Sequence, residues 1–225
     1  MILRVLGVDT SGALGSVAMV DSGGGVVERR MESSEGHGQR IFYEIEELLR
    51  ECGVGLAMVD GFAAGAGPGS FTGVRIALSA VKGLAEALGK PAFGVSNLQA
   101  LAWHGSGPLR AAVMDARRGQ IYGGVFDAGL GKVTQEMVGP MGEWLASLPG
   151  GEIEFVTAEP ALLEEGLRGT EWEGPAIRQA PGTLAVAIAR IALGRMEAGE
   201  RPAGVDLDAN YVRRSDAEMN WQDVY

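Results

Sequence analysis

The sequence predicts an α/β protein made of two similar halves, each with helices packed on a mixed sheet. Short apolar runs bounded by turn residues alternate with segments of helical spacing, a pattern typical of this class. The order strand, strand, strand, helix, strand, helix also occurs twice, with an offset of roughly 105 residues. The Gly- and Pro-containing stretch 105–108 is a candidate boundary, so we expect subdomains at 1–104 and 105–225.

The first half is expected to contain both strands and helices. Apolar runs between turn signals predict the strands Ile2–Val8, Gly15–Val20, Val26–Met31, Val59–Gly65 and Pro91–Val95. Apolar residues at three- and four-residue steps predict the helices His37–Cys52, Val74–Leu88 and Asn97–His104. Ser70 and Thr72 are expected to cap the start of the second helix, and Gly89 to end it. Ser96 is expected to cap the third.

The second half repeats this order. The same signals predict the strands Arg110–Met114, Gln120–Phe126, Lys132–Val138 and Ile153–Thr157. They predict the helices Met141–Leu148, Pro160–Leu167 and Thr183–Ala198. The last stretch, Ser215–Tyr225, is polar, so we expect a C-terminal tail at the periphery of the fold.

Composition and charge restrict the functions that the chain can have. Of 225 residues, 46% are hydrophobic and 21% are charged, which excludes a wholly disordered chain. The formal net charge is −10, and such a surface repels phosphate, which disfavours nucleic-acid binding by the chain alone. Cys52 is the single cysteine, so no intramolecular disulfide can form and a cytoplasmic location is expected. The longest apolar stretch, 184–193, is too short for a membrane span and contains Arg190.

Two turns and one glycine-rich loop are candidates for binding a nucleotide. Glycines 67, 69 and 73 precede a predicted helix, as a phosphate cradle requires, but the loop lacks Gly-Lys-Ser/Thr and has Ser70 where a dinucleotide motif has its third glycine. The polar turn 9–11 could hold a Mg²⁺–phosphate group or simply close a hairpin. The corresponding turn 115–119, with Arg117, could contact a nucleotide or a partner, or only reverse the chain.

The residues for hydrolytic or metal chemistry are scarce. Ser70 has Pro68 and Thr72 where a nucleophile elbow needs glycines, and only His37 and His104 could act as its base. His37 is followed four residues later by Ile41, so no histidine pair lies on one helical face. We therefore expect neither a serine hydrolase nor a metal site.

The predicted helix 74–88 is more apolar than a single buried stripe requires. Small residues such as Gly73 and Ala77 stand among its large ones, and small residues let another helix approach closely. The helix is therefore either an interface or fully buried, and spacing alone leaves both open.

Several segments resemble the TsaB (YeaZ) family in the family's order, strongly over residues 1 to 126. The most specific is the loop and helix start Gly67-Pro68-Gly69-Ser70-Phe71-Thr72-Gly73-Val74-Arg75-Ile76. The others are Gly7-Val8-Asp9-Thr10-Ser11, His37-x-Gln39-Arg40, Gly94-Val95-Ser96-Asn97-Leu98 and Asp115-Ala116-Arg117-Arg118-Gly119. The closing Tyr211-Val212-Arg213 departs from the family pattern, because Asn210 precedes it and the family's proline is absent.

The resemblance implies the actin/sugar-kinase-like fold (ASKHA, ribonuclease H-like), to which two halves of the predicted kind also correspond. It implies a non-catalytic activator that pairs with a TsaD-type transferase in making threonylcarbamoyladenosine, the modified adenosine beside the tRNA anticodon. The family's catalytic relative carries a metal on a His-x-x-x-His helix, whereas the second position here is Ile41. A TsaE-type ATPase is implied as a further partner, with ATP or ADP and Mg²⁺ in the TsaD–TsaE complex. A homodimer is implied for the chain alone, and tRNA contact only through the partner.

The resemblance also implies which residues act. Partner contacts are expected on the first two helices, at His37, Arg40, Ile41, Ser70, Phe71, Thr72, Arg75, Ala77, Val81 and Lys82. Candidate nucleotide contacts, vestigial or interfacial, are Asp9, Thr10, Ser11 and Arg117. No catalytic residue, metal or cofactor of its own is expected. The alternatives are an active kinase or ATPase of the same superfamily, with a nucleotide on Asp9, and a peptidase.

Overall fold

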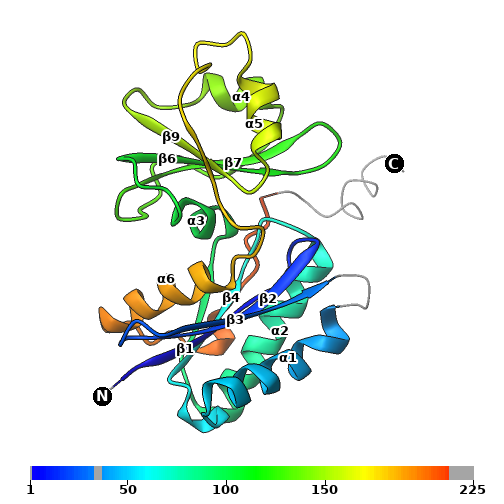
Figure 1. Cartoon of the computed structure of the whole chain (residues 1–225), viewed down its shortest axis with the longest axis vertical. Coiled ribbons are helices and arrows are strands. Elements are labelled where there is room, and N and C mark those ends of the chain that lie inside the picture. The colour runs from blue at the N-terminus through cyan, green and yellow to red at the C-terminus, as the bar shows by residue number, and fades with distance from the viewer. Residues whose placement is uncertain (1, 33–36, 213–225) are drawn as a thin grey trace.

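Two five-stranded sheets form the frame of the chain, which the computed structural model describes over residues 2–32 and 37–212 (Figure 1). The strands of the first sheet are β1 (Arg4–Asp9), β2 (Leu14–Asp21), β3 (Val26–Glu32), β4 (Gly61–Gly65) and β5 (Ala92–Val95). Those of the second are β6 (Leu109–Asp115), β7 (Ile121–Asp127), β8 (Met137–Gly139), β9 (Ile153–Thr157) and β10 (Ile177–Gln179).

The helices connect and cover these strands. They are α1 (His37–Cys52), α2 (Phe71–Leu88), α3 (Asn97–Ala102), α4 (Met141–Ala146), α5 (Pro160–Leu167) and α6 (Ala185–Glu197). Two short 3₁₀ turns are η2 (Leu56–Met58) and η3 (Gly204–Asp206). Within the described part of the chain, no helix is long and apolar enough to cross a membrane.

Both sheets have the same topology. The strand order is β3-β2-β1-β4-β5 in the first and β10-β9-β6-β7-β8 in the second. In each, the first strand of the half lies in the middle, antiparallel to the second strand and parallel to the fourth. β6 therefore takes the place of β1, and the repeat that the sequence predicts is confirmed.

Five layers follow one another through the molecule, alternating helices and sheets (Figure 1). Helices α1 and α2 cover the outer face of the first sheet, α3 and α6 lie between the sheets, and α4 and α5 cover the outer face of the second. Alternate residues of one strand face opposite layers, so Val5 and Leu6 of β1 belong to different apolar clusters.

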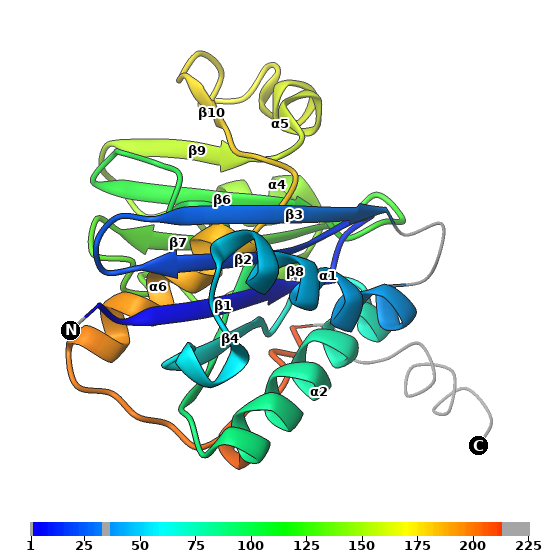
Figure 2. The same cartoon turned by 60° about the horizontal axis from the view of Figure 1, so that its bottom comes forward.

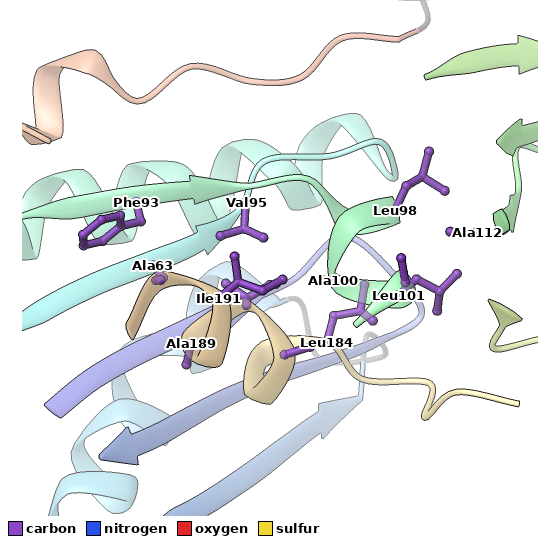
Figure 3. Close-up of a cluster of buried hydrophobic side chains, with 14 of the residues drawn as sticks. Ala63, Phe93, Val95, Leu98, Ala100, Leu101, Ala112, Leu184, Ala189 and Ile191 are labelled. Atoms are coloured by element: carbon purple, nitrogen blue, oxygen red, sulfur yellow. The ribbon is translucent and has the colours of Figure 1, made fainter. Parts of the chain in front are cut away.

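Helix α6 follows every strand of the second sheet but packs on β1, β2 and β4 of the first. The approach is close because β1 carries Gly7 there: a Cβ at this position would lie 2.4 Å from the carbonyl oxygen of Ala185. The core around α6 also reaches the second sheet (Figure 3). It includes Phe93 of β5, Leu98 of α3 and Ala112 of β6, so one apolar cluster joins the two sheets.

The start of α2 differs from the prediction. The helix begins at Phe71 instead of Val74, because the Ser70 hydroxyl accepts a hydrogen bond from the backbone N–H of Gly73 at 3.3 Å. The predicted cap at Ser70 is thus confirmed, while Thr72 lies inside the first turn and is not a cap. Gly89 ends the helix in a left-handed conformation with φ 61°, as predicted.

The predicted strand Lys132–Val138 is largely wrong. Lys132 forms only an isolated bridge with Phe126, and the strand β8 begins at Met137. Between them Glu136 turns inward, where its side chain is 2% exposed and accepts a hydrogen bond from the Ser96 hydroxyl at 2.7 Å. β10 was not predicted, since its three residues, Ile-Arg-Gln, give no strand pattern.

Candidate partner-docking site

An open groove of about 510 Å³ lies between α1 and α2 on the outer side of the molecule. Figure 2 shows the two helices covering the same face of the first sheet. The residues that line the groove are Gly38, Ile41, Phe42, Phe71, Thr72, Arg75, Ile76, Ser79 and Ala80.

The α1 wall of the groove is apolar because Phe42 lies outside the buried stripe of that helix. Ile41, Ile45 and Leu48 point into the core, with at most 3% of each exposed. Phe42 and Tyr43 lie on the outer side and are 56% and 55% exposed. Aromatic side chains exposed beside a groove are typical of protein–protein interfaces. The sequence prediction missed Phe42, although a large aromatic residue off the buried stripe is a readable signal.

The predicted contact residues have different outcomes. Phe71, Thr72 and Arg75 line the groove and are exposed, and Ser70 is exposed at its end. Ala77 and Val81 are completely buried, so the prediction that they contact a partner directly is wrong. Their side chains pack in the cluster between α2 and the first sheet.

Of the other predicted contacts, Ile41 lines the groove, Arg40 and Lys82 are not among its lining residues, and one falls outside the described structure. Ile41 forms part of the floor but is 1% exposed, so it contributes almost no surface. Arg40 donates a hydrogen bond at 2.6 Å to Glu44, a carboxylate buried under α1 that also pairs with Arg29. Lys82 is half-buried, and its backbone lies under the turn η3. The side chain of His37 lies outside the described part.

At the start of α2, the groove is bounded by a stack of three side chains. The Arg75 guanidinium lies 3.7 Å from the centre of the Phe71 ring, and its Nε donates a hydrogen bond of 3.0 Å to the Tyr211 hydroxyl. The rings of Phe71 and Tyr211 lie 5.6 Å apart, centre to centre. Tyr211 was not among the predicted contacts, although it falls in the closing motif of the sequence.

The turn 9–11 after β1 is a second predicted site, and its polar groups are engaged within the chain. Oδ1 of Asp9 accepts hydrogen bonds from the backbone N–H and the hydroxyl of Ser11, at 2.9 and 2.7 Å. The Ser11 hydroxyl accepts another from Asn97 at 2.7 Å, and the Thr10 hydroxyl donates to the carbonyl oxygen of Gly73 at 2.6 Å. All three turn residues are at most 5% exposed.

These contacts fit a Mg²⁺–phosphate group poorly. The loop before α2 is pressed against the turn: a Cβ at Gly73 would lie 1.9 Å from the carbonyl oxygen of Thr10. Among the described residues, no hydrogen bond or ion pair links Arg117 to the turn 9–11 or to the loop before α2. Its guanidinium is 83% exposed and pairs with Asp115 at 3.4 Å. Among the described residues, no three His, Cys, Asp or Glu side chains are grouped as a metal site would require.

The groups needed for a peptidase are not brought together in the described part of the chain. The Ser70 hydroxyl is used as a helix cap, and His104 follows α3, with its Nε2 buried and without a hydrogen-bond partner. Burial lowers the pKa of His104 below its usual 6.5, and the nearby negative charge of Glu28 offsets only part of this.

Comparison with known proteins identifies related chains. A family model described as "TsaD: tRNA N6-adenosine threonylcarbamoyltransferase" matches residues 14–164. The tRNA threonylcarbamoyladenosine biosynthesis protein TsaB of Escherichia coli is 38% identical over 125 residues, 53% of each chain. TsaB of Bacillus subtilis is 27% identical over 97% of this chain and 98% of its own. The match to the Escherichia coli protein thus spans about half of that relative's length.

A solved structure agrees over a longer span. It is that of an uncharacterized Pseudomonas aeruginosa protein with similarity to peptidase YEAZ, and it is 28% identical, with a TM-score of 0.79. The alignment covers 94% of this chain and all of the other.

The duplicated sheet topology, with helices between and outside the two sheets, is that of the actin-like (ASKHA) fold. The chain belongs to the TsaD-like family that the model describes, in its TsaB (YeaZ) branch.

Proposed function

We propose that the chain is a non-catalytic activator of a TsaD-type transferase in the biosynthesis of threonylcarbamoyladenosine in tRNA. It acts by forming a heterodimer, with the α1–α2 groove as its docking face. The names of the TsaB relatives support the pathway, and the match to a TsaD model supports a partner of the same fold.

The observation that carries this proposal is the groove itself. Phe42 and Phe71 lie on its two walls and are 56% and 41% exposed. The cationic side chain of Arg75 lines the groove beside these apolar side chains. Interfaces concentrate aromatic residues and arginine in this way, because such side chains bury much apolar surface with few polar groups to desolvate.

The non-catalytic part of the proposal rests on the packed turn. One oxygen of Asp9 and the hydroxyls of Thr10 and Ser11 are already engaged, in a region at most 5% exposed. A nucleotide could reach them only if the loop before α2 moved away. We therefore propose that ATP or ADP and Mg²⁺ act in the complex of TsaD-type and TsaE-type partners, and that tRNA is held mainly by the partner. We also propose a homodimer for the chain alone and the cytoplasm as its location.

An active ATPase or kinase is the second candidate, because Asp9 ends the first strand and Thr10 and Ser11 follow it, where ATPases of this fold carry a carboxylate and small hydroxyl residues. It predicts ATP turnover by the purified chain that Asp9→Ala abolishes. A peptidase is the third, and it predicts casein cleavage that Ser70→Ala abolishes. If either activity is found and lost in its variant, the non-catalytic proposal is wrong.

Light scattering after size exclusion tests the docking face. The chain is measured alone and mixed with the TsaD-type protein of the same organism, and a one-to-one complex is expected. Phe42→Glu should abolish that complex while circular dichroism stays unchanged, because the side chain is 56% exposed. The matched control is Val133→Glu in the second subdomain, which is 44% exposed and away from the groove.

The results separate the alternatives. A complex that also restores tRNA modification supports the proposal. If Phe42→Glu still forms the complex, the docking face lies elsewhere on the chain. If the unaltered chain forms no complex, heterodimerisation is contradicted.

A further inference from the structure

The stack at the end of the groove joins segments far apart in the sequence. Phe71 and Arg75 belong to the first two turns of α2, whereas Tyr211 comes from the C-terminal segment after η3. Arg75 lies over the Phe71 ring and donates to the Tyr211 hydroxyl, so two independent contacts fix the orientation of its guanidinium.

The C-terminal segment is itself held in place. The backbone N–H of Asn210 donates to the carbonyl oxygen of Ala66 at 2.7 Å, and its side chain donates to the buried carboxylate of Glu136. Ala66 opens the loop that leads into α2. Tyr211 is thus fastened to the same loop that starts the helix, and its hydroxyl reaches Arg75 from a fixed position.

The guanidinium still has binding capacity. Its Nε is used by Tyr211, but among the described residues no carboxylate forms an ion pair with Arg75. By contrast, nearby Arg40 and Arg29 share Glu44. The two terminal nitrogens of an arginine can bind a carboxylate in a bidentate manner, and an arginine that is already oriented loses less entropy on binding.

We infer that Arg75 is the residue through which the groove recognises a carboxylate side chain of the docked protein, and that Tyr211 is its positioning residue. This inference rests on the docking face proposed above. The apolar lining next to Arg75 favours a protein carboxylate over an RNA phosphate, because burying Phe42 and Ile76 requires an apolar surface beside the acidic group.

Binding to the TsaD-type protein of the same organism, measured by calorimetry, tests the inference. Arg75→Ala should weaken the complex on the order of 30-fold, as loss of a central arginine contact does. Tyr211→Phe keeps the ring and removes the hydroxyl, so it should weaken binding roughly fivefold. The matched control Arg168→Ala removes an exposed arginine of the second subdomain and should change nothing.

The double variant separates positioning from a direct contact. If Tyr211 acts through Arg75, Tyr211→Phe should have no further effect in the Arg75→Ala background. Raising the salt concentration should weaken the complex of the unaltered chain more than that of Arg75→Ala, which a merely structural role would not produce. Arg75→Lys should recover part of the salt dependence without the full affinity, since lysine lacks the planar fork.

Each other result overturns the inference. If Arg75→Ala and the unaltered chain bind with equal affinity, Arg75 makes no contact with a carboxylate of the partner. If the effects of Arg75→Ala and Tyr211→Phe add fully in the double variant, Tyr211 does not act through Arg75. If Arg75→Ala leaves the protein complex intact but weakens its binding to tRNA, the anion is a phosphate. If the unaltered chain forms no complex at all, the docking face itself fails, and the inference fails with it.

Discussion

The hydroxyl of Thr10 donates a 2.6 Å hydrogen bond to the carbonyl oxygen of Gly73, joining the turn after β1 to the first turn of α2. Both groups are buried, so this bond fixes α2 to the centre of the first sheet. The backbones approach so closely that only glycine fits at position 73.

We expect Gly73→Ala to destabilise the fold by about 2–4 kcal/mol, because its Cβ would lie 1.9 Å from the Thr10 carbonyl oxygen and the backbones would have to separate. Urea unfolding measures this. Gly83→Ala in the same helix is the matched control: no atom lies within 4 Å of its Cβ, so it should stabilise by about 0.5–1 kcal/mol. Equal effects of the two would contradict the close packing.

Glu44 is expected to anchor α1 to β3. Its side chain is 1% exposed and pairs with Arg29 at 2.9 Å and Arg40 at 2.6 Å. Glu44→Gln leaves both cations facing a neutral group and should lower the free energy of unfolding by about 2 kcal/mol. Glu47→Gln on the same helix removes an exposed pair with Arg50, and its unfolding curve should overlay that of the unaltered chain.

His104 should make stability depend on pH. Burial lowers its pKa below 6.5, so as the pH falls below 6.5 the unfolded chain takes up a proton before the folded chain does. The free energy of unfolding should therefore decrease as the pH falls from 7.5 towards 5.5. His104→Gln should remove this part of the slope. The two histidines can be titrated separately by NMR, and a His104 pKa at or above 6.5 would contradict the prediction.

Glu154 should make stability depend on pH in a more acidic range than His104 does. Its partial burial alone would raise its pKa, but hydrogen bonds from the backbone N–H groups of Gly107 and Ser106, with Arg178, lower the pKa below its usual 4.5. The stability that this carboxylate contributes is present above pH 4.5 and lost as the pH falls through the lowered value. Glu154→Gln should make the free energy of unfolding depend less on pH in that window, and the matched control is Glu159→Gln, which removes an exposed carboxylate close by in sequence.

Much of the fold could be predicted because the same order of strands and helices occurs twice in the chain. Apolar strands such as β1 and a capped helix such as α2 carry strong local signals, and the repeat fixes their order. The course of the chain before β8 could not be predicted, because a charged residue such as Glu136 is normally expected at the surface. Its buried position depends on hydrogen bonds from Ser96 and Asn210, which are distant in the sequence.

The candidate docking site also contains residues that could be predicted from the sequence and residues that could not. The motif singles out Phe71, Thr72 and Arg75, and the structure shows them exposed in one groove, while their contact with a partner stays a prediction. Ala77 and Val81 share that helix, but helical spacing does not tell which face meets the sheet. Tyr211 is separated from Arg75 by most of the chain, and contacts between such distant segments leave no periodic pattern.

The return of α6 to the first sheet has a consequence for synthesis on the ribosome. The strands β1 to β5 emerge early, yet the helix that covers their inner face, Ala185–Glu197, is translated after the whole second sheet. Until then, apolar side chains such as Val5 and Phe93 have no cover on that side. The nascent first half therefore exposes apolar surface until α6 has been synthesised, and the first sheet cannot complete its packing before that helix is available.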